Sequence, residues 1–320
     1  MDIKEKGTVK AVCISESKGT VKTAVPVITM KEGFGIEHDA HAGSWHRQVS
    51  FLGLSSVEAF EKESEVKVEA GAFGENILVE GFDPSKLRPG STVSIGDAVL
   101  EITQIGKECH TSCKIRQMTG KCIMPVYGVF AEVKHGGEVK PGDKIEVKYP
   151  DPKRPFQAAV ITVSDKGAAG IREDKSGPLM EQMLKDSGYE VREKVIIPDE
   201  KKMIKREITR LSDKRGMDLI LTSGGTGFSH RDVTPEATEE VIERKVPGIP
   251  EALRMHSMQF TDHALLSRQT AGIRGSSLIV NLPGSPKAVR EDLEYILPKI
   301  EHGLRILRDT VYECGGNDNA

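Results

Sequence analysis

The stretch Asp218–Thr238, DLILTSGGTGFSHRDVTPEAT, decides the fold of the second half of this chain. Its short apolar run is typical of a buried strand, and Gly224, Gly225 and Gly227 follow directly. Glycine permits positive φ angles and lets an anion approach backbone N–H groups closely. A helix is expected next, with Thr234 as N-cap before a proline and an acid. A plain strand-to-helix turn needs fewer glycines, so the pattern favours a site for a phosphate or a pterin phosphate.

Around this stretch, strand and helix patterns alternate. Apolar runs predict strands, and amphipathic runs predict helices. The strands are expected at 157–163, 189–197, 218–222 and 277–282, and the helices at 176–187, 200–214, 235–243, 250–267 and 286–307. This alternation predicts an α/β domain, a mostly parallel sheet with helices on both faces. Ligands of such folds bind beyond the carboxyl ends of the strands.

Polar residues follow each of these predicted strands and are expected to meet at one edge of the sheet. The candidates are Ser164, Asp165, Asp199, Thr222, Ser223, Gly224, Gly225, Thr226, Gly227, Arg231, Asp232, Pro283, Gly284 and Ser285. Carboxylates hold Mg²⁺, while amides and cations neutralise phosphate charge. Ser285 is expected to cap a helix whose N-terminus can receive an anion. The set suits phosphoryl or nucleotidyl transfer with Mg²⁺, although each residue also has a simpler structural explanation, such as interaction with a helix dipole.

The first half of the chain is rich in short β-type segments separated by glycine turns, with a short helix expected at 55–62. The segments are 7–14, 24–30, 48–54, 76–79, 92–95, 98–105 and 144–147. Many short strands with such turns favour an all-β barrel or sandwich. Three prolines at 149–155 predict a linker. We therefore expect two domains, 1–150 and 156–314.

Composition narrows the class of protein. The 320 residues are 38% hydrophobic and 29% charged, with a net charge of −3. This balance does not indicate nucleic acid or an anionic membrane as a partner. The first ten residues carry no apolar signal segment, and no apolar run approaches membrane-spanning length. Five cysteines, an odd number, are expected to be reduced thiols in a cytoplasmic protein.

The segment 106–122, GKECHTSCKIRQMTGKC, gathers Cys109, His110, Cys113 and Cys122. Zinc binding is one interpretation, but the Cys-x3-Cys spacing lacks the paired Cys-x2-Cys of a structural zinc site. Neighbouring residues in a strand would also point to opposite faces. Thiols packed as small hydrophobic groups are the plainer alternative. Lysine and arginine residues nearby would instead stabilise a thiolate.

Two further polar clusters lie upstream. One contains His38, His41 and Arg47, and the other contains Glu75 and Asn76. The histidines can ligate a metal, or they can line an anion pocket together with Arg47.

Motifs of the second half resemble the bacterial MogA/MoaB family of molybdopterin adenylyltransferases. The matching segments are 161–165 (ITVSD), 174–178 (DKSGP), 198–200 (PDE), 222–227 (TSGGTG), 231–238 (RDVTPEAT), 266–268 (LSR) and 282–288 (LPGSPKA). The resemblance covers nearly all of residues 157–312. It implies a trimeric α/β domain in which molybdopterin and Mg-ATP give adenylylated molybdopterin and pyrophosphate. It also implies that Asp199 and Asp232 are catalytic and hold Mg²⁺ or the reacting phosphates.

The three clusters of the first half resemble the MOSC domain, a β-barrel module of molybdenum cofactor sulfurases and related proteins. His38-Asp39-x-His41, Phe73-Gly-Glu-Asn76 and Gly106-Lys-x-Cys109 carry the likeness, over about residues 5–148. The resemblance implies that Cys109 carries sulfur or coordinates molybdenum. The pyridoxal-phosphate domain of the sulfurases is absent from this chain.

Together the resemblances imply a protein of molybdenum cofactor biosynthesis that adenylylates molybdopterin in its second domain and binds the cofactor, or carries sulfur, in its first. Fusion of two domains raises the local concentration of a shared intermediate. The expected partners are molybdopterin, ATP and other assembly proteins, in a homotrimer, without nucleic acid or membrane. A non-catalytic carrier of molybdopterin and a molybdenum-dependent reductase built on the MOSC domain remain alternatives.

Overall fold

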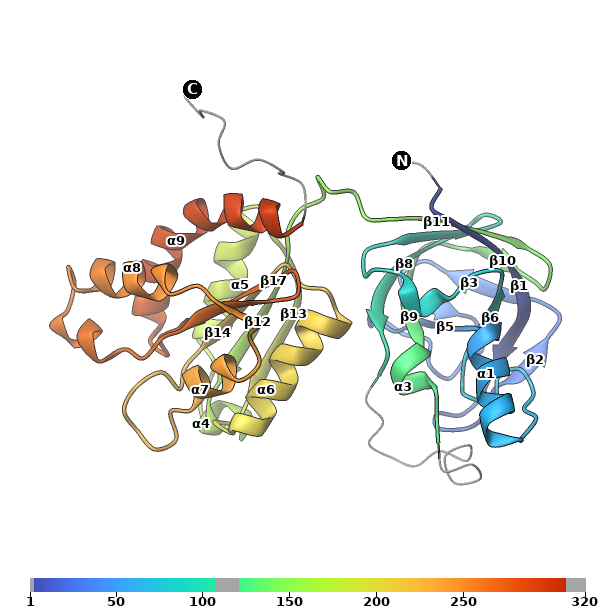
Figure 1. The fold of residues 1–320 in the computed structure, drawn as a ribbon, viewed down its shortest axis with the longest axis horizontal. Coiled ribbons are helices and arrows are strands. Elements are labelled where there is room, and N and C mark those ends of the chain that lie inside the picture. Colours follow the sequence, from blue (N-terminus) through green and yellow to red (C-terminus); the bar gives the residue numbers. More distant parts are fainter. Residues whose placement is uncertain (1–2, 108–120, 309–320) are drawn as a thin grey trace. The chain divides into compact units, whose positions relative to one another are not determined.

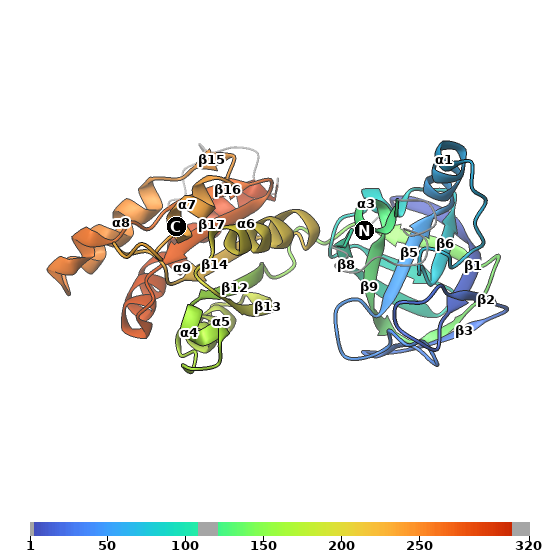
Figure 2. The ribbon, with the colours of Figure 1, turned by 90° about the horizontal axis from the view of Figure 1, so that it is seen from below.

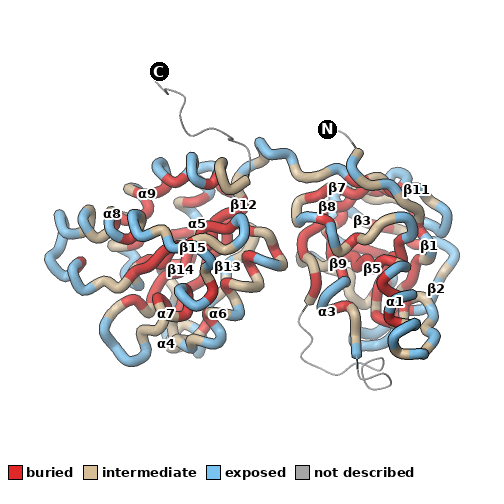
Figure 3. The backbone as a smooth tube through the Cα atoms, viewed as in Figure 1, coloured by how far each residue is buried: buried red, intermediate tan, exposed pale blue. Residues whose placement is uncertain are grey.

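The structure, a computed structural model, describes residues 3–107 and 121–308, and the chain divides into two compact units. The N-terminal unit ends at Asp151 and the C-terminal unit starts at Pro152. Figure 1 shows strands throughout the first unit and a helix-covered sheet in the second. Each unit has a buried interior of its own (Figure 3). Within the described ranges, no helix has both the length and the apolar character needed to cross a membrane.

The N-terminal unit is a β-barrel, as predicted. Its elements are β1 (Glu5–Ile14), β2 (Thr23–Val25), β3 (Ile28–Lys31), β4 (Gly35–Ile36), β5 (Val49–Gly53), α1 (Leu54–Ser64), β6 (Ile77–Glu80), η1 (Pro84–Lys86), β7 (Thr92–Ile95), β8 (Ala98–Ile105), α3 (Met124–Tyr127), β9 (Val129–His135), β10 (Gly137–Val139) and β11 (Lys144–Lys148). The main sheet has the order β11-β7-β8-β9-β5-β6-β1-β2, and pairing of β11 with β1 closes it. Closure satisfies the backbone groups that an open sheet edge would expose.

Alternation along the strands explains the barrel core. Val9, Val93, Ile95 and Ile145 point inward and are almost completely buried. A second apolar cluster lies between α1 and the outer face of the strands, where Phe60 packs edge-to-face on a neighbouring aromatic ring. Figure 2 shows α1 outside the ring of strands. The strand expected at 24–30 is interrupted between β2 and β3, because the proline there has no N–H for the ladder.

The C-terminal unit is an α/β domain, also as predicted. Its elements are β12 (Gln157–Val163), α4 (Asp165–Ala168), α5 (Ser176–Asp186), β13 (Glu190–Ile197), α6 (Lys201–Thr209), η2 (Arg210–Lys214), β14 (Leu219–Ser223), α7 (Thr234–Glu239), β15 (Arg244–Lys245), α8 (Gly248–Ser257), η3 (Asp262–Leu266), β16 (Ala271–Arg274), β17 (Ser277–Leu282) and α9 (Pro286–Leu307). The sheet order is β13-β12-β14-β17-β16-β15. The first four strands are parallel, and β16 and β15 add an antiparallel edge.

Strand periodicity places the two layers of helices. In β12, Ala158 and Val160 face the cluster formed with α5, α8 and α9, whereas Ala159 and Ile161 face the cluster formed with α6 and α7. Successive side chains of a strand point to opposite faces, so a strand covered on both faces is apolar throughout. All of β12 is buried for this reason.

Two predicted helices differ from the structure. The single helix expected at 250–267 is wrong, because α8 ends at Ser257 and a separate 3-10 helix, η3, follows. The hydroxyl of Thr261 starts η3 by accepting a hydrogen bond from the His263 N–H, at 3.3 Å. The helix expected at 235–243 ends at Glu239, because the chain must extend to pair β15 with β16.

Candidate functional site

The carboxyl ends of β12, β13, β14 and β17 lie side by side in the C-terminal sheet. A cavity of about 720 Å³ opens at this edge. It is lined by residues 162–164, Gly167, 172–176, Asp199, 223–225 and 284–286. Since ligands of parallel α/β sheets bind beyond these strand ends, we take the cavity as the candidate active site.

The glycine loop after β14 forms one wall of the cavity. Gly224 and Gly225 have positive φ angles of 103° and 64°, as their sequence context predicts. A Cβ atom at Gly224 would overlap with the Val163 carbonyl oxygen, so only glycine fits. Within the described residues, the amides of Gly225, Thr226 and Gly227 have no hydrogen-bond partner. These amides can receive an anion.

Asp199 is the carboxylate that reaches the cavity from the end of β13. Its Oδ2 accepts a hydrogen bond from the Asp165 N–H at 2.7 Å, and Asp165 Oδ1 accepts one from the Asp199 N–H at 3.0 Å. This reciprocal pair joins the ends of β13 and β12. Burial raises the pKa of the Asp199 carboxyl, and the negative charges of Asp165 and Asp232 raise it further. The site therefore holds Asp199 in a position where positive charge would be favourable.

Asp232 and Arg231 shape the far end of the glycine loop. Asp232 Oδ2 accepts a hydrogen bond from the Ser229 N–H at 2.8 Å, and a Cβ at Gly227 would lie 2.9 Å from the same oxygen. Arg231 binds Asp165 with two hydrogen bonds, of 2.7 and 3.0 Å. This contact lowers the pKa of Asp165. Arg231 is thus occupied by a carboxylate, and its charge serves to position Asp165.

The structure brings about half of the predicted residues into the cavity wall. The ones that line it are Ser164, Asp199, Ser223, Gly224, Gly225, Gly284 and Ser285. The others surround the wall without lining it: Asp165, Thr222, Thr226, Gly227, Arg231, Asp232 and Pro283. Thr222, for example, is fully buried and accepts a hydrogen bond from Asn281 Nδ2. The functional roles of all these residues stay predictions.

Residues 172–176, between α4 and α5, form a second wall that was not among the predicted site residues. Asp174 accepts hydrogen bonds from the N–H groups of Ser176 and Gly177, at 3.1 and 2.9 Å, and from Thr162 Oγ1 at 2.9 Å. Ser176 Oγ in turn donates to the Gly284 carbonyl at 3.0 Å. The segment 174–178 was visible in the sequence as a motif, but its residue types alone did not place it in the cavity.

Two expected helix caps are corrected by the structure. Ser285 occupies the N-cap position of α9, but its hydroxyl makes no capping hydrogen bond. Val233 rather than Thr234 is the N-cap residue of α7, and within the described chain the buried Thr234 hydroxyl has no hydrogen-bond partner. The Thr234 N–H instead donates to the Gly225 carbonyl at 3.1 Å, which draws Thr234 into the first turn of the helix.

The residues at the cavity fit Mg²⁺ only together with phosphate oxygens. No group of three His, Cys, Asp or Glu side chains within 3–107 and 121–308 is arranged to hold a metal. Mg²⁺ is commonly held by one or two carboxylates together with substrate phosphates and water. The raised pKa of Asp199 marks a place where a divalent cation would relieve repulsion among carboxylates.

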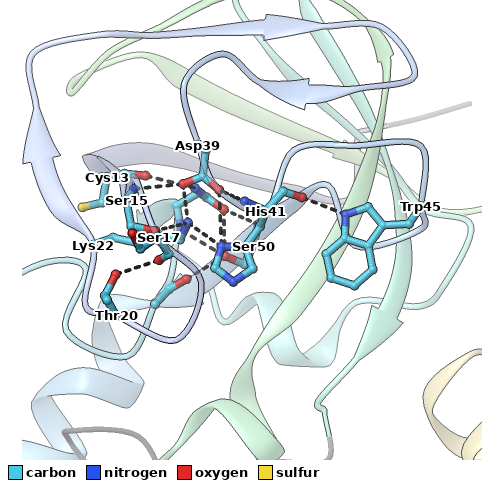
Figure 4. Close-up of polar contacts among 11 residues, drawn as sticks. Cys13, Ser15, Ser17, Thr20, Lys22, Asp39, His41, Trp45 and Ser50 are labelled. Atoms are coloured by element: carbon cyan, nitrogen blue, oxygen red, sulfur yellow. Dashed lines mark hydrogen bonds and ion pairs between the residues drawn. The ribbon is translucent and has the colours of Figure 1, made fainter.

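A buried polar cluster in the N-terminal unit centres on Asp39 (Figure 4). Asp39 forms an ion pair with Lys22, and the side chains of both are 1% exposed or less. Its oxygens also accept hydrogen bonds from Ser15 N, His41 N and Asn76 Nδ2, at 3.1, 2.9 and 3.2 Å. Burial raises the pKa of Asp39, but hydrogen bonds from His41 and Lys22 outweigh burial and hold the pKa well below its usual range.

Of the predicted MOSC residues, the structure gathers His41 and Asn76 around this cluster. His41 Nδ1 lies 3.3 Å from Lys22 Nζ. His38 is exposed, in a left-handed conformation with φ of 62°. The carboxylate of Glu75 accepts hydrogen bonds from two turn amides, at 2.6 and 3.1 Å, and Arg47 lies 4.7 Å from the centre of the Trp45 ring.

The predicted cysteines have different outcomes. Cys109, His110 and Cys113 lie outside the described residues. Cys122 is half-buried and packs against the apolar cluster beside α1. Cys13 adjoins the Asp39 cluster through its carbonyl, and burial raises the pKa of its thiol to about 12. Asp39 was part of the quoted His38–His41 motif but was not named as a site residue. Lys22 was missed, and nothing in the local sequence signals that it is buried.

Comparison with known proteins agrees with this division into two units. A family model described as "Probable molybdopterin binding domain" matches residues 159–302, and the MOSC domain model matches residues 38–146. The molybdopterin adenylyltransferase of Helicobacter pylori is 43% identical over 150 residues, which cover 46% of this chain and 85% of that protein. The one from Escherichia coli is 41% identical over 142 residues, 43% of this chain and 72% of that protein.

A solved structure of the molybdopterin biosynthesis enzyme MoaB from Thermus thermophilus is 44% identical, covers 49% of this chain and 99% of that chain, and has a TM-score of 0.47. The match to the molybdopterin-binding family model identifies the C-terminal unit as an α/β domain of the MogA/MoaB type. The chain belongs to the molybdopterin adenylyltransferase family through this unit, and it also carries a MOSC domain. The protein is therefore one of molybdenum cofactor biosynthesis.

Proposed function

We propose that the C-terminal unit transfers AMP from Mg-ATP to molybdopterin. An oxygen of the terminal pterin phosphate attacks the α-phosphorus of ATP and forms a new P–O bond. The bond from the α-phosphorus to the oxygen bridging to the β-phosphate breaks, and pyrophosphate leaves with that electron pair. The products are adenylylated molybdopterin and pyrophosphate. No oxidant or reductant is needed.

The observation that carries this proposal is the position of Asp199 in the cavity, beside glycine amides that have no hydrogen-bond partner in the described part of the chain. The amides of Gly225 and Gly227 suit the negative charge that develops on phosphate oxygens in the transition state. Asp199, with Asp232 at the other end of the glycine loop, would hold Mg²⁺ or orient the reacting phosphates. Mg²⁺, when bound, supplies positive charge to the phosphates. A protein that only bound a phosphate anion would gain nothing from a half-buried carboxylate here.

The test replaces these carboxylates by amides of the same shape. In Asp199→Asn the side-chain oxygen still accepts the Asp165 N–H, so the fold should persist. We expect Asp199→Asn and Asp232→Asn each to lower the rate of pyrophosphate release from molybdopterin and Mg-ATP on the order of 100-fold, as for loss of one electrostatic contact to a transition state. Glu200→Gln, a neighbour of Asp199 that does not line the cavity, is the matched control.

Full activity in the double variant, which carries both Asp199→Asn and Asp232→Asn, would refute the assignment of these two carboxylates. Failure of the wild-type protein to release pyrophosphate, while it still retains molybdopterin, would favour a non-catalytic carrier instead.

For the N-terminal unit we propose that the MOSC domain binds the cofactor or carries sulfur to it, with Cys109 as the residue that holds sulfur or molybdenum. The match to the MOSC family model and the residues His41 and Asn76 near the Asp39 cluster support this proposal. Mass spectrometry of the native protein tests it. A persulfide on Cys109 supports sulfur transfer, and bound pterin with molybdenum supports cofactor binding. The absence of both a persulfide on Cys109 and a bound pterin would contradict the proposal.

We also propose that the protein acts as a homotrimer through its C-terminal unit, together with other molybdenum cofactor assembly proteins. Exposed apolar side chains on and after α8 support an interface there: Met255, Met258, Phe260, Leu265 and Leu266. Exposed apolar groups gathered in one segment are typical of protein–protein contacts.

A further inference from the structure

Two cations line the wall formed by residues 172–176, and neither was assigned a role above. Arg172 and Lys175 both face the cavity. Within residues 3–107 and 121–308, neither side chain makes an ion pair or a hydrogen bond. Both residues are exposed to solvent. Their positive charge is therefore available to whatever fills the cavity.

The other cations near the glycine loop are already bound to protein groups. Arg231 is held by Asp165 through two hydrogen bonds. Arg268 forms an ion pair with Glu236 and donates to the carbonyl of Gly227 at 2.7 Å. Neither of them lines the cavity.

The backbone that carries Arg172 and Lys175 is held in place by Asp174. The three hydrogen bonds that Asp174 accepts fix the start of α5 to β12, and they occupy its negative charge. Gly177 fits only because it lacks a Cβ, which would overlap with Asp174 Oδ2 and lie 2.8 Å from Thr162 Oγ1. The bond from Ser176 Oγ to the Gly284 carbonyl joins this segment to the turn before α9. The hydrogen-bonded backbone of this segment thus carries two exposed cationic side chains at the cavity.

We propose that Arg172 and Lys175 bind phosphate groups of the substrates. This inference rests on the proposed adenylyl transfer and identifies which side chains carry the opposite charge. ATP and molybdopterin both bring negative phosphates into a cavity that already contains Asp199. Backbone amides supply dipoles only, so cations are needed to balance the charge. Arginine binds phosphate through two parallel hydrogen bonds, and lysine acts as a point charge.

Two sources share this chemistry: the β- and γ-phosphates of ATP, and the terminal phosphate of molybdopterin. The experiment distinguishes them by varying one substrate while the other is saturating. Arg172→Gln and Lys175→Gln are compared with Lys202→Gln, an exposed lysine in the first turn of α6 that does not line the cavity. Because the side chains of Arg172 and Lys175 are exposed and make no ion pair or hydrogen bond with the residues that the structure describes, both variants should fold as the wild type does.

We expect each cavity variant to raise KM on the order of 10-fold or more for the substrate whose phosphate it binds, since a charge-assisted hydrogen bond contributes about 1.5–3 kcal/mol. The Lys202→Gln control should keep the wild-type KM for both substrates. Lys175→Arg, which keeps the positive charge, should have a KM much closer to the wild-type value than Lys175→Gln. A raised KM for ATP identifies the triphosphate as the ligand, and a raised KM for molybdopterin identifies the pterin phosphate. Unchanged KM values for both substrates in both variants would overturn the inference.

A binding measurement separates this inference from the proposed reaction. Calorimetric titration with pyrophosphate, and separately with molybdopterin, measures phosphate affinity without catalysis. One outcome is that the wild type binds either ligand while the cavity variants bind it at least about 10-fold more weakly. In that case phosphate binding by Arg172 and Lys175 is supported even when no pyrophosphate is released. If the wild type is active but the variants match it in both titrations and in KM, the proposed function stands, and the inference that Arg172 and Lys175 bind phosphate is wrong.

Discussion

Asp39 is a buried charged residue of the N-terminal unit, and the groups around it affect the stability of that unit. Its carboxylate is fully buried, and its charge is compensated by Lys22 and by donors from three other residues. A buried ion pair adds little to the free energy of unfolding compared with an apolar pair of similar size. Loss of one partner, however, leaves an uncompensated buried charge, which is strongly destabilising. The pair thus fixes the loop that carries His41 against β1.

We predict that Lys22→Met destabilises the N-terminal unit by about 3–5 kcal/mol. Urea unfolding monitored by fluorescence measures this unit by itself, because Trp45 is the single tryptophan of the chain. Lys31→Met removes the cation of an exposed ion pair with Glu37 and serves as the control. We expect that variant to unfold at nearly the wild-type urea concentration. Equal effects of the two substitutions would contradict the buried-pair interpretation.

The pH dependence of this effect has a definite sign. The folded state holds the pKa of Asp39 below its unfolded value of about 3.9, so the pair stabilises the protein above that pH. This stability is lost as the pH falls toward the folded pKa. In Lys22→Met the buried carboxylate can be neutralised by a proton, so its deficit relative to the wild type should shrink on acidification below about pH 4. A deficit that stayed constant with pH would contradict this.

Single residues of the C-terminal site were partly visible in the sequence. Asp199, Gly224 and Gly225 lie where the strand-end argument placed them, at the cavity. Arg231 was named as a substrate-binding candidate; in the structure it binds Asp165, and its role toward a substrate stays a prediction. Asp174 and Lys175 belong to a motif that was visible in the sequence, but they were not assigned to the site, because a loop of mixed polar residues has no periodicity that would place it. Only the folded chain shows that this loop closes over the same strand ends.

At the scale of elements, the glycine loop between β14 and α7 depends on its backbone conformation. Gly225 has φ of 64°, and a Cβ there would overlap with Thr234 Oγ1 and lie 3.2 Å from Asp199 Oδ1. Gly275, in the turn between β16 and β17, has a similar φ of 54°, but a Cβ would meet nothing within 4 Å. The two positions separate backbone strain from steric overlap.

We predict that Gly225→Ala lowers the melting temperature more than Gly275→Ala does. Both variants incur about 1–2 kcal/mol for an L-residue in the left-handed region, and only Gly225→Ala also displaces Thr234 or Asp199. Pyrophosphate release should fall on the order of 100-fold in Gly225→Ala alone, because small misplacements at a reacting centre have effects of this size. Calorimetry and the activity assay check the two parts. Equal melting temperatures and equal activities would show that the loop tolerates a side chain.

Helices and strands with a clear apolar pattern could be predicted from the sequence. Element ends that depend on contacts with other parts of the fold could not. The strand predicted at 277–282 and the helix predicted at 286–307 have the same bounds as β17 and α9. The strand is a mostly apolar run that ends at a proline and a glycine, and the helix has a long apolar periodicity. The end of α7 and the break between α8 and η3 depend on pairing with β16 and on the Thr261 cap, which periodicity does not record.

At the scale of the whole molecule, the proline-rich segment before β12 is held against the C-terminal unit. Arg308, at the end of α9, donates hydrogen bonds to the carbonyls of Arg154 and Pro155, at 2.7 and 2.9 Å. It also binds the buried Asp218 and lies 4.1 Å from the centre of the Phe156 ring. The segment from Pro152 onward therefore moves with the C-terminal unit.

We predict that Arg308→Gln exposes this segment to trypsin after Lys153. Hydrogen bonds to a charged group contribute about 1.5–3 kcal/mol each, so loss of several should raise the open population at least about tenfold. Limited proteolysis of the full chain at low enzyme concentration measures the rate. Arg305→Gln, one turn earlier on α9 and paired with Glu301, is the control and should be cut like the wild type. Similar cleavage rates in all three proteins would contradict this anchoring role.

The sequence by itself determined the class of each half, because strand and helix periodicities and glycine turns are local consequences of backbone geometry. It also determined which strand ends carry glycines and carboxylates. Only the tertiary structure decided which of these groups share a cavity, that Arg231 is bound to Asp165, and that Lys22 is buried beside Asp39. Burial and charge pairing arise between residues far apart in the chain, and their energies depend on distances that exist only once the chain has folded.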